Sequence, residues 1–248
     1  MDLEAQPLDE EAEIETVVVD DIDLPASLER LDGPLPYDSR HLRRVAGSLL
    51  NEAMVIARPR AAFRLSLILD GRDEGLDRIE IGPVVLESPV LTKNLRGLGR
   101  AFPFLATEGP ELAGWAASLA PRDRTAAFVI RYLALKEAER RLEERLSGEY
   151  GISGLGAMSP GVLPAWPLSG QGPLFELLQP LPKELGVSLK GDSFWMSPDV
   201  SSSGLYFETE AGFHNCRLCP LDRCPLRRFV RDGQENGPAD GDLRGLGA

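Results

Sequence analysis

The chain has 248 residues, of which 43% are hydrophobic and 27% are charged, and its formal net charge at pH 7 is −12. This composition is typical of soluble globular proteins, and the length suffices for one large domain or two small ones. No apolar run is long enough to cross a bilayer and no basic lead precedes an apolar segment, so we expect neither a membrane span nor a secretory signal.

The negative charge is concentrated at the amino terminus. Residues 1–23 hold ten acidic residues and no basic one, so removing those ten charges from −12 leaves −2 for the remaining chain. We expect residues 1–24 to be a disordered acidic tail, with docking onto a basic partner as the alternative. The rest of the chain has no basic stripe of the kind that binds phosphate backbones, which argues against a nucleic-acid partner.

Hydrophobic periodicity predicts the first helix at residues 39–57, which the segment Arg58-Pro59-Arg60 ends. The next segment alternates between apolar and polar residues, which predicts a strand with one buried face. A further strand is predicted between Ile79 and Val85. The apolar positions of the alternating segment are Phe63, Leu65, Leu67 and Leu69.

Two short helices that begin with proline flank a buried strand. Ser88 followed by Pro89 predicts a capped helix through residue 95. The apolar run at residues 101–106 predicts a buried strand, and Pro110 begins a helix through residue 119.

The longest predicted helix spans residues 125–146, contains neither Gly nor Pro, and ends at Ser147-Gly148. The first half of this helix is apolar on two sides. In the second half one of those sides becomes charged, which predicts that the helix begins buried and emerges into solvent. Glu137 lies where the second apolar face stops, and is therefore a candidate for the lip of a pocket. The main apolar stripe comprises Phe128, Tyr132, Leu135, Leu142 and Leu146.

Residues 151–172 are rich in Gly, Pro and Ser, which predicts a long loop that is functional or disordered. A short helix at 174–178 and short strands at 187–189 and 203–207 follow. The sequence therefore predicts one α+β domain over residues 25–230, and a second disordered tail over residues 231–248.

All three cysteines, Cys216, Cys219 and Cys224, lie within nine residues, and His214 precedes them. An odd, clustered set without a secretory signal argues against a disulfide scaffold and for a reducing cytoplasm. Thiolates separated by two residues can hold one metal, and His214 completes four ligands for zinc. An iron–sulfur cluster is the alternative, because proline follows two of the three cysteines. Three free thiols remain the third interpretation.

Residues 192–207 read Asp-Ser-Phe-Trp-Met-Ser-Pro-Asp-Val-Ser-Ser-Ser-Gly-Leu-Tyr-Phe. This stretch resembles the Glu/Asp-Ser-x-x-Met-x-Pro-x-x-Ser-x-Ser-Gly-x-Tyr-Phe pattern of the activation domain of cobalamin-dependent methionine synthase, and of short free-standing proteins related to it. Ser159-Pro160-Gly161 is similar to that family's Pro-Gly loop, and Glu137-Ala138 resembles its helix with a ligand-contacting glutamate. The resemblance covers about residues 85–215.

The resemblance implies an α+β fold with a bent, mainly antiparallel sheet, flanking helices, and a shallow groove for S-adenosylmethionine. It implies that Glu137 contacts the ligand's charged groups, that the backbone of Ser159-Pro160-Gly161 approaches the ligand, and that Phe213 falls near the family's paired tyrosines. The sequence departs from the family at Ala157, where the family has arginine, and at Val162, where it has an aromatic residue. The missing arginine removes a carboxylate clamp and puts S-adenosylmethionine binding in question.

Two hypotheses follow from the resemblance and the cysteines. In the first, the protein is a cytoplasmic activation module that supports reductive, S-adenosylmethionine-linked reactivation of cobalamin on a partner corrinoid protein or methionine synthase module. The electron then comes through the cysteine cluster or from an external electron donor. In the second, the protein is a non-catalytic, zinc-stabilised binding protein that docks a corrinoid protein.

Overall fold

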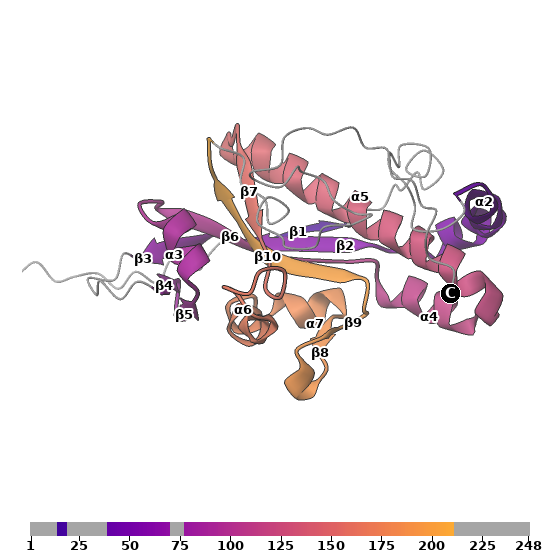
Figure 1. Cartoon of the computed structure of the whole chain (residues 1–248). Helices are drawn as coiled ribbons and strands as arrows, with labels where there is room; N and C mark the ends of the chain where they lie inside the picture. The colour runs from indigo at the N-terminus through magenta and orange to yellow at the C-terminus, as the bar shows by residue number, and fades with distance from the viewer. Residues whose placement is uncertain (1–13, 19–38, 70–76, 211–248) are drawn as a thin grey trace, which may run out of the picture.

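The computed structural model describes residues 14–18, 39–69 and 77–210 (Figure 1). The amino-terminal elements are β1 (Ile14–Val18), α2 (Ser39–Ile56), β2 (Arg60–Arg64), β3 (Ser66–Leu69), β4 (Arg78–Ile81), β5 (Val84–Glu87), α3 (Pro89–Leu95) and β6 (Arg100–Thr107). The remaining elements are α4 (Pro110–Ser118), α5 (Arg124–Tyr150), β7 (Leu155–Met158), α6 (Gln171–Leu177), α7 (Leu181–Leu185), β8 (Ser188–Leu189), β9 (Met196–Ser197) and β10 (Ser201–Glu208).

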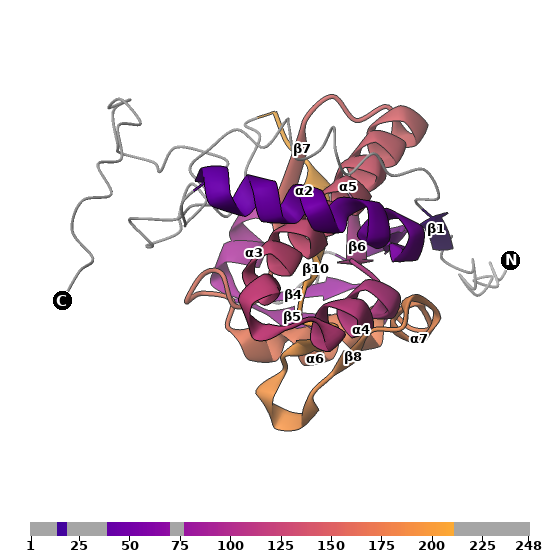
Figure 2. The same ribbon diagram turned by 90° about the vertical axis from the view of Figure 1, so that its right-hand side faces the viewer.

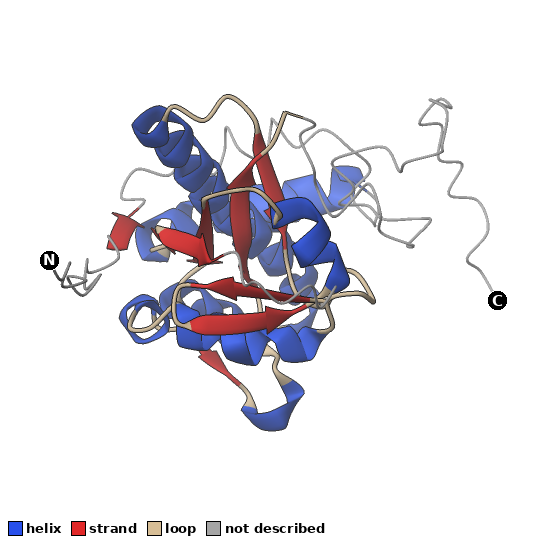
Figure 3. Cartoon of the chain, turned by 90° about the vertical axis from the view of Figure 1, so that its left-hand side faces the viewer, coloured by secondary structure: helices blue, strands red, loops and turns tan. Residues whose placement is uncertain are grey.

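The main sheet of the described residues has eight strands, pairs antiparallel throughout, and is built around β6. One edge of β6 pairs with β2 and then β3, and the other edge pairs with β10, which in turn pairs with β7. Because β4 and β5 attach to β3 while β1 attaches to β2, the sheet divides into two arms. The strands consequently point in different directions (Figures 1 and 3).

Helix α5 covers one face of this sheet with an aromatic core. Every residue of β6 from Ala101 to Thr107 is buried. On the α5 side, the rings of Phe63 and Phe102 meet edge to face at 5.9 Å, and those of Phe104 and Tyr206 stack at 4.1 Å. Such ring pairs stabilise beyond the area they bury. Tyr150 of α5 joins them, with its ring centroid 4.9 Å from that of Phe102, and so ties the helix to β6. The helix contributes Leu135, Ala138, Leu142 and Leu146.

The opposite face of the sheet is covered by α3, α6 and α7, whose leucines pack with residues of β3, β4 and β5. A third cluster joins the first half of α5 to α2 and α4. Figure 2 shows α2 crossing α5 on the side away from the sheet. The first half of α5 is therefore buried against the sheet and against α2 and α4, but the predicted main stripe is wrong at its start, because Phe128 is 46% exposed. No helix of the described segments is both long and apolar enough to cross a membrane.

The predicted α+β class is confirmed, as are α2, the helices after Ser88 and Gly109, the buried strand β6 and the final strand β10. The Ser88 hydroxyl accepts the backbone N–H of Leu91 at 3.3 Å, which is the predicted amino-terminal cap. These elements were predictable because each depends on residues within a few positions of one another.

The prediction that one face of the segment 63–69 is buried holds only for its first part. Leu67 and Leu69 are 55% and 44% exposed, whereas Ser66 and Ile68 are buried. The register against β6 is unbroken from β2 to β3, so the alternation itself is intact. Phe63 packs in the core beneath α5, but Leu67 and Leu69 extend beyond that core and face solvent.

Further predictions need correction. Ile14–Val18 form β1, so the disordered-tail prediction is wrong for those five residues. The predicted strand between Ile79 and Val85 is a hairpin of two strands, and the predicted loop at 151–172 contains β7. Helix α5 passes Ser147-Gly148 and ends at Gly151, whose φ of 65° gives a left-handed cap.

Candidate functional site

Three consecutive serines attach β10 to three neighbouring elements. Each hydroxyl lies within hydrogen-bond distance of a side chain on another element, so the serine run connects β10 to its neighbours. The distances are 2.9 Å from Ser201 to Thr107 of β6, 2.6 Å from Ser202 to Glu139 of α5, and 2.7 Å from Ser203 to Gln171 of α6.

Gly204 lies where β10 passes close to the end of β7. A Cβ atom at this position would lie 2.8 Å from Ser159 Oγ, 2.9 Å from Phe104 Cε1, and closer still to the backbone oxygen of Met158. Only glycine therefore fits here without displacing β7. The fit brings the predicted residue Ser159 directly against β10.

The predicted Pro160-Gly161 loop is a tight turn after β7. Gly161 has a φ of 81°, and its backbone N–H donates to the Trp166 carbonyl at 2.8 Å. The Ala165 carbonyl accepts the Ser88 hydroxyl at 2.8 Å, which ties the segment after the turn to the start of α3. The turn is thus preorganised, with Gly161 exposed and Pro160 buried.

Glu137 is buried in α5 and its carboxylate is held by the guanidinium groups of Arg140 and Arg141. The hydrogen bond from Arg140 outweighs burial and holds the pKa of Glu137 below its usual value. Glu137 is therefore a fixed anion on the helix, and a ligand that contacts it would meet the two arginines as well.

The described contacts do not join Glu137 to the Ser159–Gly161 turn. The predicted residues Phe213, His214, Cys216, Cys219 and Cys224 lie outside the described residues. Within the described segments, no group of three or more His, Cys, Asp or Glu side chains is placed to hold a metal ion. The ligand and metal assignments made from the sequence therefore stay predictions.

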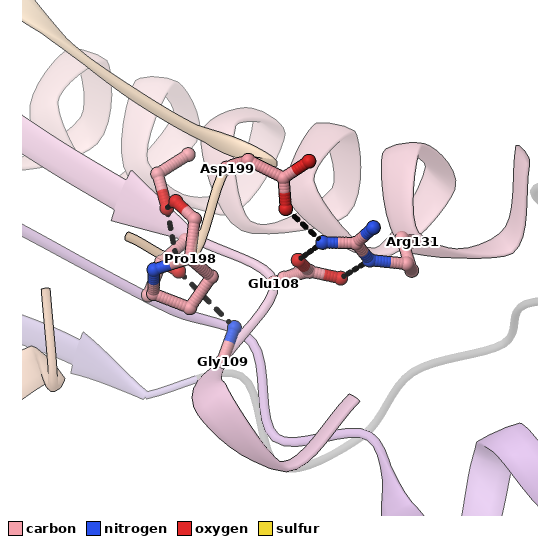
Figure 4. A network of polar contacts seen from close by, with 7 residues as sticks. Glu108, Gly109, Arg131, Pro198 and Asp199 are labelled. Carbon is pink, nitrogen blue, oxygen red and sulfur yellow. Dashed lines mark hydrogen bonds and ion pairs between the residues drawn. The ribbon is translucent and has the colours of Figure 1, made fainter. Parts of the chain in front are cut away.

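Sequence reasoning missed a buried polar cluster between the end of β6 and the start of α4. Glu108 is 0% exposed and its carboxylate accepts two hydrogen bonds from the Arg131 guanidinium of α5, one of them at 2.6 Å (Figure 4). The same guanidinium donates to Asp199, which lies just before β10. The sequence does contain a signal for this cluster. Glu108 directly follows a strand predicted to be buried, and a buried carboxylate needs a partner of opposite charge.

Burial is the largest influence on the pKa of Glu108 and raises it, despite the opposing effect of Arg131. For Asp199 burial acts in the same direction but the bond from Arg131 prevails, so the pKa of Asp199 is lowered. The two carboxylates thus share the Arg131 cation, but the pKa of Glu108 is raised whereas that of Asp199 is lowered. This arrangement fixes the turn at Pro198 against α5.

A hollow of about 340 Å³ lies at the other end of β10, lined by Leu67, Leu98, Gly99, Arg100 and Glu208. Arg100 lies over the rings of Phe102 and Tyr150 at 5.6 and 5.5 Å. The described residues end at 210, so the predicted ligand residue Phe213 lies three residues beyond them.

No family model matches the sequence, and no curated protein sequence matches it. Among solved structures, the crystal structure of the MetH reactivation domain bound to AdoHcy is similar, with a TM-score of 0.54 and 16% identity. The alignment covers 79% of this chain and 78% of that chain. At this identity the likeness shows a shared fold, which agrees with the fold that the sequence resemblance implied.

Proposed function

We propose that the protein is an activation-domain-like component of a cobalamin-dependent methyltransferase system, which binds S-adenosylmethionine or S-adenosylhomocysteine and acts on cobalamin carried by a partner protein. The supporting observation is the fold shared with the MetH reactivation domain, whose crystal structure contains AdoHcy. The family-like segments support it further, because the Ser159–Gly161 turn packs beside Gly204 of β10.

The residues present fit the methyl donor in part. The turn offers an exposed glycine backbone for close approach, as the family's loop does. Ala157, which pairs with Tyr206 of β10, offers no charge for the ligand's carboxylate, and Val162 is 39% exposed but not aromatic. We therefore expect binding through the adenosine part, with an affinity below that of a site with an arginine clamp.

The chemistry proposed for the pair of proteins has two steps. One electron reduces the partner's cobalt from +2 to +1, and the methyl group then passes from the sulfonium to that cobalt, leaving S-adenosylhomocysteine. The methyl transfer draws the unfavourable reduction forward. The task of this chain is to orient the methyl donor and to exclude competing nucleophiles.

The source of the electron is either an external donor or a cluster held by Cys216, Cys219 and Cys224 with His214. The second candidate function, a zinc-stabilised protein that docks a corrinoid protein, is favoured by Ala157 and Val162. Metal and sulfide content of protein purified without oxygen separates the two. Iron with labile sulfide supports the redox function with the cluster as electron source. Stoichiometric zinc without iron gives the cysteines a structural role, favours the docking function, and leaves an external donor as the electron source of the redox function.

Ligand binding is tested by titrating the full chain with S-adenosylhomocysteine in a calorimeter. Gly161→Ala should weaken binding at least tenfold, because the substitution strains the turn and its Cβ would meet Leu168 at 2.9 Å. Gly97→Ala is the matched control, since its φ of 80° carries the same backbone strain but nothing lies within 4 Å. Absence of saturable binding to the wild-type protein at millimolar ligand would refute the proposal.

A further inference from the structure

A second hollow, of about 350 Å³, lies between α4, the start of α5 and the segment that joins β9 to β10. None of the residues that the resemblance assigns to a ligand lines it. Three alanines of α4 form an apolar wall, and the polar lining comes from segments far apart in the sequence. The polar lining side chains are Arg124, Arg131, Lys190, Ser197 and Asp199.

The cations of this hollow differ in what they already bind. Arg131 is committed to Glu108 and Asp199, so this group of three carries one negative charge when both acids are ionised. Arg124 and Lys190 are exposed, and within the described residues neither forms an ion pair within 4.0 Å, although the charge of Lys190 contributes to lowering the pKa of Asp199. They add two positive charges and make the hollow positive, in a chain whose net charge is −12.

The donors also come from three separate segments of the chain. Arg124 enters from the first residue of α5, Lys190 from the turn after β8, and Ser197 from the end of β9. Three donor groups on three segments match the three free oxygens of a phosphate monoester, whereas a planar carboxylate offers only two oxygens. The volume is at the lower end of the range for small-molecule pockets, and the alanine wall accepts an apolar group.

We propose that this hollow binds a small phosphate monoester, with the phosphate between Arg124, Lys190 and Ser197 and the organic part against the alanines of α4. The paired Asp199 at the same wall disfavours long polyanions such as nucleic acids. The bound ligand would link α4, α5 and the β8–β9 hairpin, and would therefore stabilise their arrangement.

Calorimetric titration of the full chain with phenyl phosphate tests the proposal, with benzoate and inorganic phosphate as comparators. Wild-type protein should bind phenyl phosphate more tightly than either comparator, because only phenyl phosphate uses both the donors and the apolar wall. Equal or tighter binding of benzoate would overturn the assignment to phosphate, and so would an absence of saturable binding to phenyl phosphate.

The variant Arg124→Ala/Lys190→Ala should bind phenyl phosphate at least tenfold more weakly. Lys93→Ala/Arg96→Ala is the matched control, because it removes the same two charges from exposed positions of α3 and its carboxyl-terminal cap, outside the hollow. An equal loss in this control would show general charge attraction and overturn the site. Ala117→Glu, at an exposed lining position of α4, places a carboxylate in the hollow and should abolish binding without removing any native contact of the cations.

This inference does not rest on the proposed methyltransferase role. S-adenosylhomocysteine has no phosphate, so the Gly161→Ala variant should retain phenyl phosphate binding. The Arg124→Ala/Lys190→Ala variant should likewise retain S-adenosylhomocysteine binding. Failure of one proposal is thereby distinguishable from failure of the other.

Discussion

Gly204→Ala tests the contact between β10 and the end of β7, where the predicted ligand-binding turn begins. The added Cβ would lie 2.8 Å from Ser159 Oγ, and closer to the backbone oxygen of Met158, which cannot rotate away. Overpacking usually costs about 1–3 kcal/mol, and a clash with backbone belongs at the upper end of that range. We therefore expect the free energy of unfolding to fall by about 3 kcal/mol.

Urea unfolding followed by circular dichroism measures this change, and the slope m shows whether the unfolding remains two-state. Gly114→Ala in α4 is the matched control, because its Cβ would have nothing within 4 Å. A mid-helix Gly→Ala change without a clash should stabilise the protein by about 1 kcal/mol. If Gly204→Ala stays within about 0.5 kcal/mol of wild type while the control behaves as expected, β7 is not held against β10 as described.

Arg131→Met should lower the free energy of unfolding at pH 7 by about 3–5 kcal/mol, because it leaves the Glu108 carboxylate buried without its cation; a loss below about 1 kcal/mol in urea unfolding would contradict the buried pair. Burial raises the pKa of Glu108 above 4.5, so the folded state binds this proton more tightly than the unfolded state. The contribution of Glu108 to stability therefore falls as pH rises from 4.5 through its folded pKa. Over that pH range the free energy of unfolding of wild type should fall relative to that of Glu108→Gln. A difference between the two proteins that does not change with pH would exclude the raised pKa. Ser88→Ala should cost about 1 kcal/mol by removing the cap of α3, whereas Ser48→Ala, exposed within α2, should be close to neutral in the same assay.

Sequence reasoning did not predict the contacts that Glu137 makes. Glu137 was expected at the lip of a pocket, but Arg140 and Arg141 hold its carboxylate. Those arginines lie three and four positions along the same helix, where such pairs commonly form, so this outcome was available from the sequence. The pairing of β7 with β10 was not, because strand pairing has no counterpart in local periodicity.

By itself the sequence determined the α+β class, the long helix α5, the cap at Ser88 and the buried strand β6, since each follows from residues a few positions apart. The tertiary structure alone decided that Leu67 faces solvent, because its burial depends on how far the core beneath α5 extends across the sheet. It also decided that Arg131 joins Glu108, 23 residues away, and Asp199, 68 residues away. The physical reason is that a buried charge is stabilised by whichever opposite charge the packing brings to it, and packing depends on the whole chain.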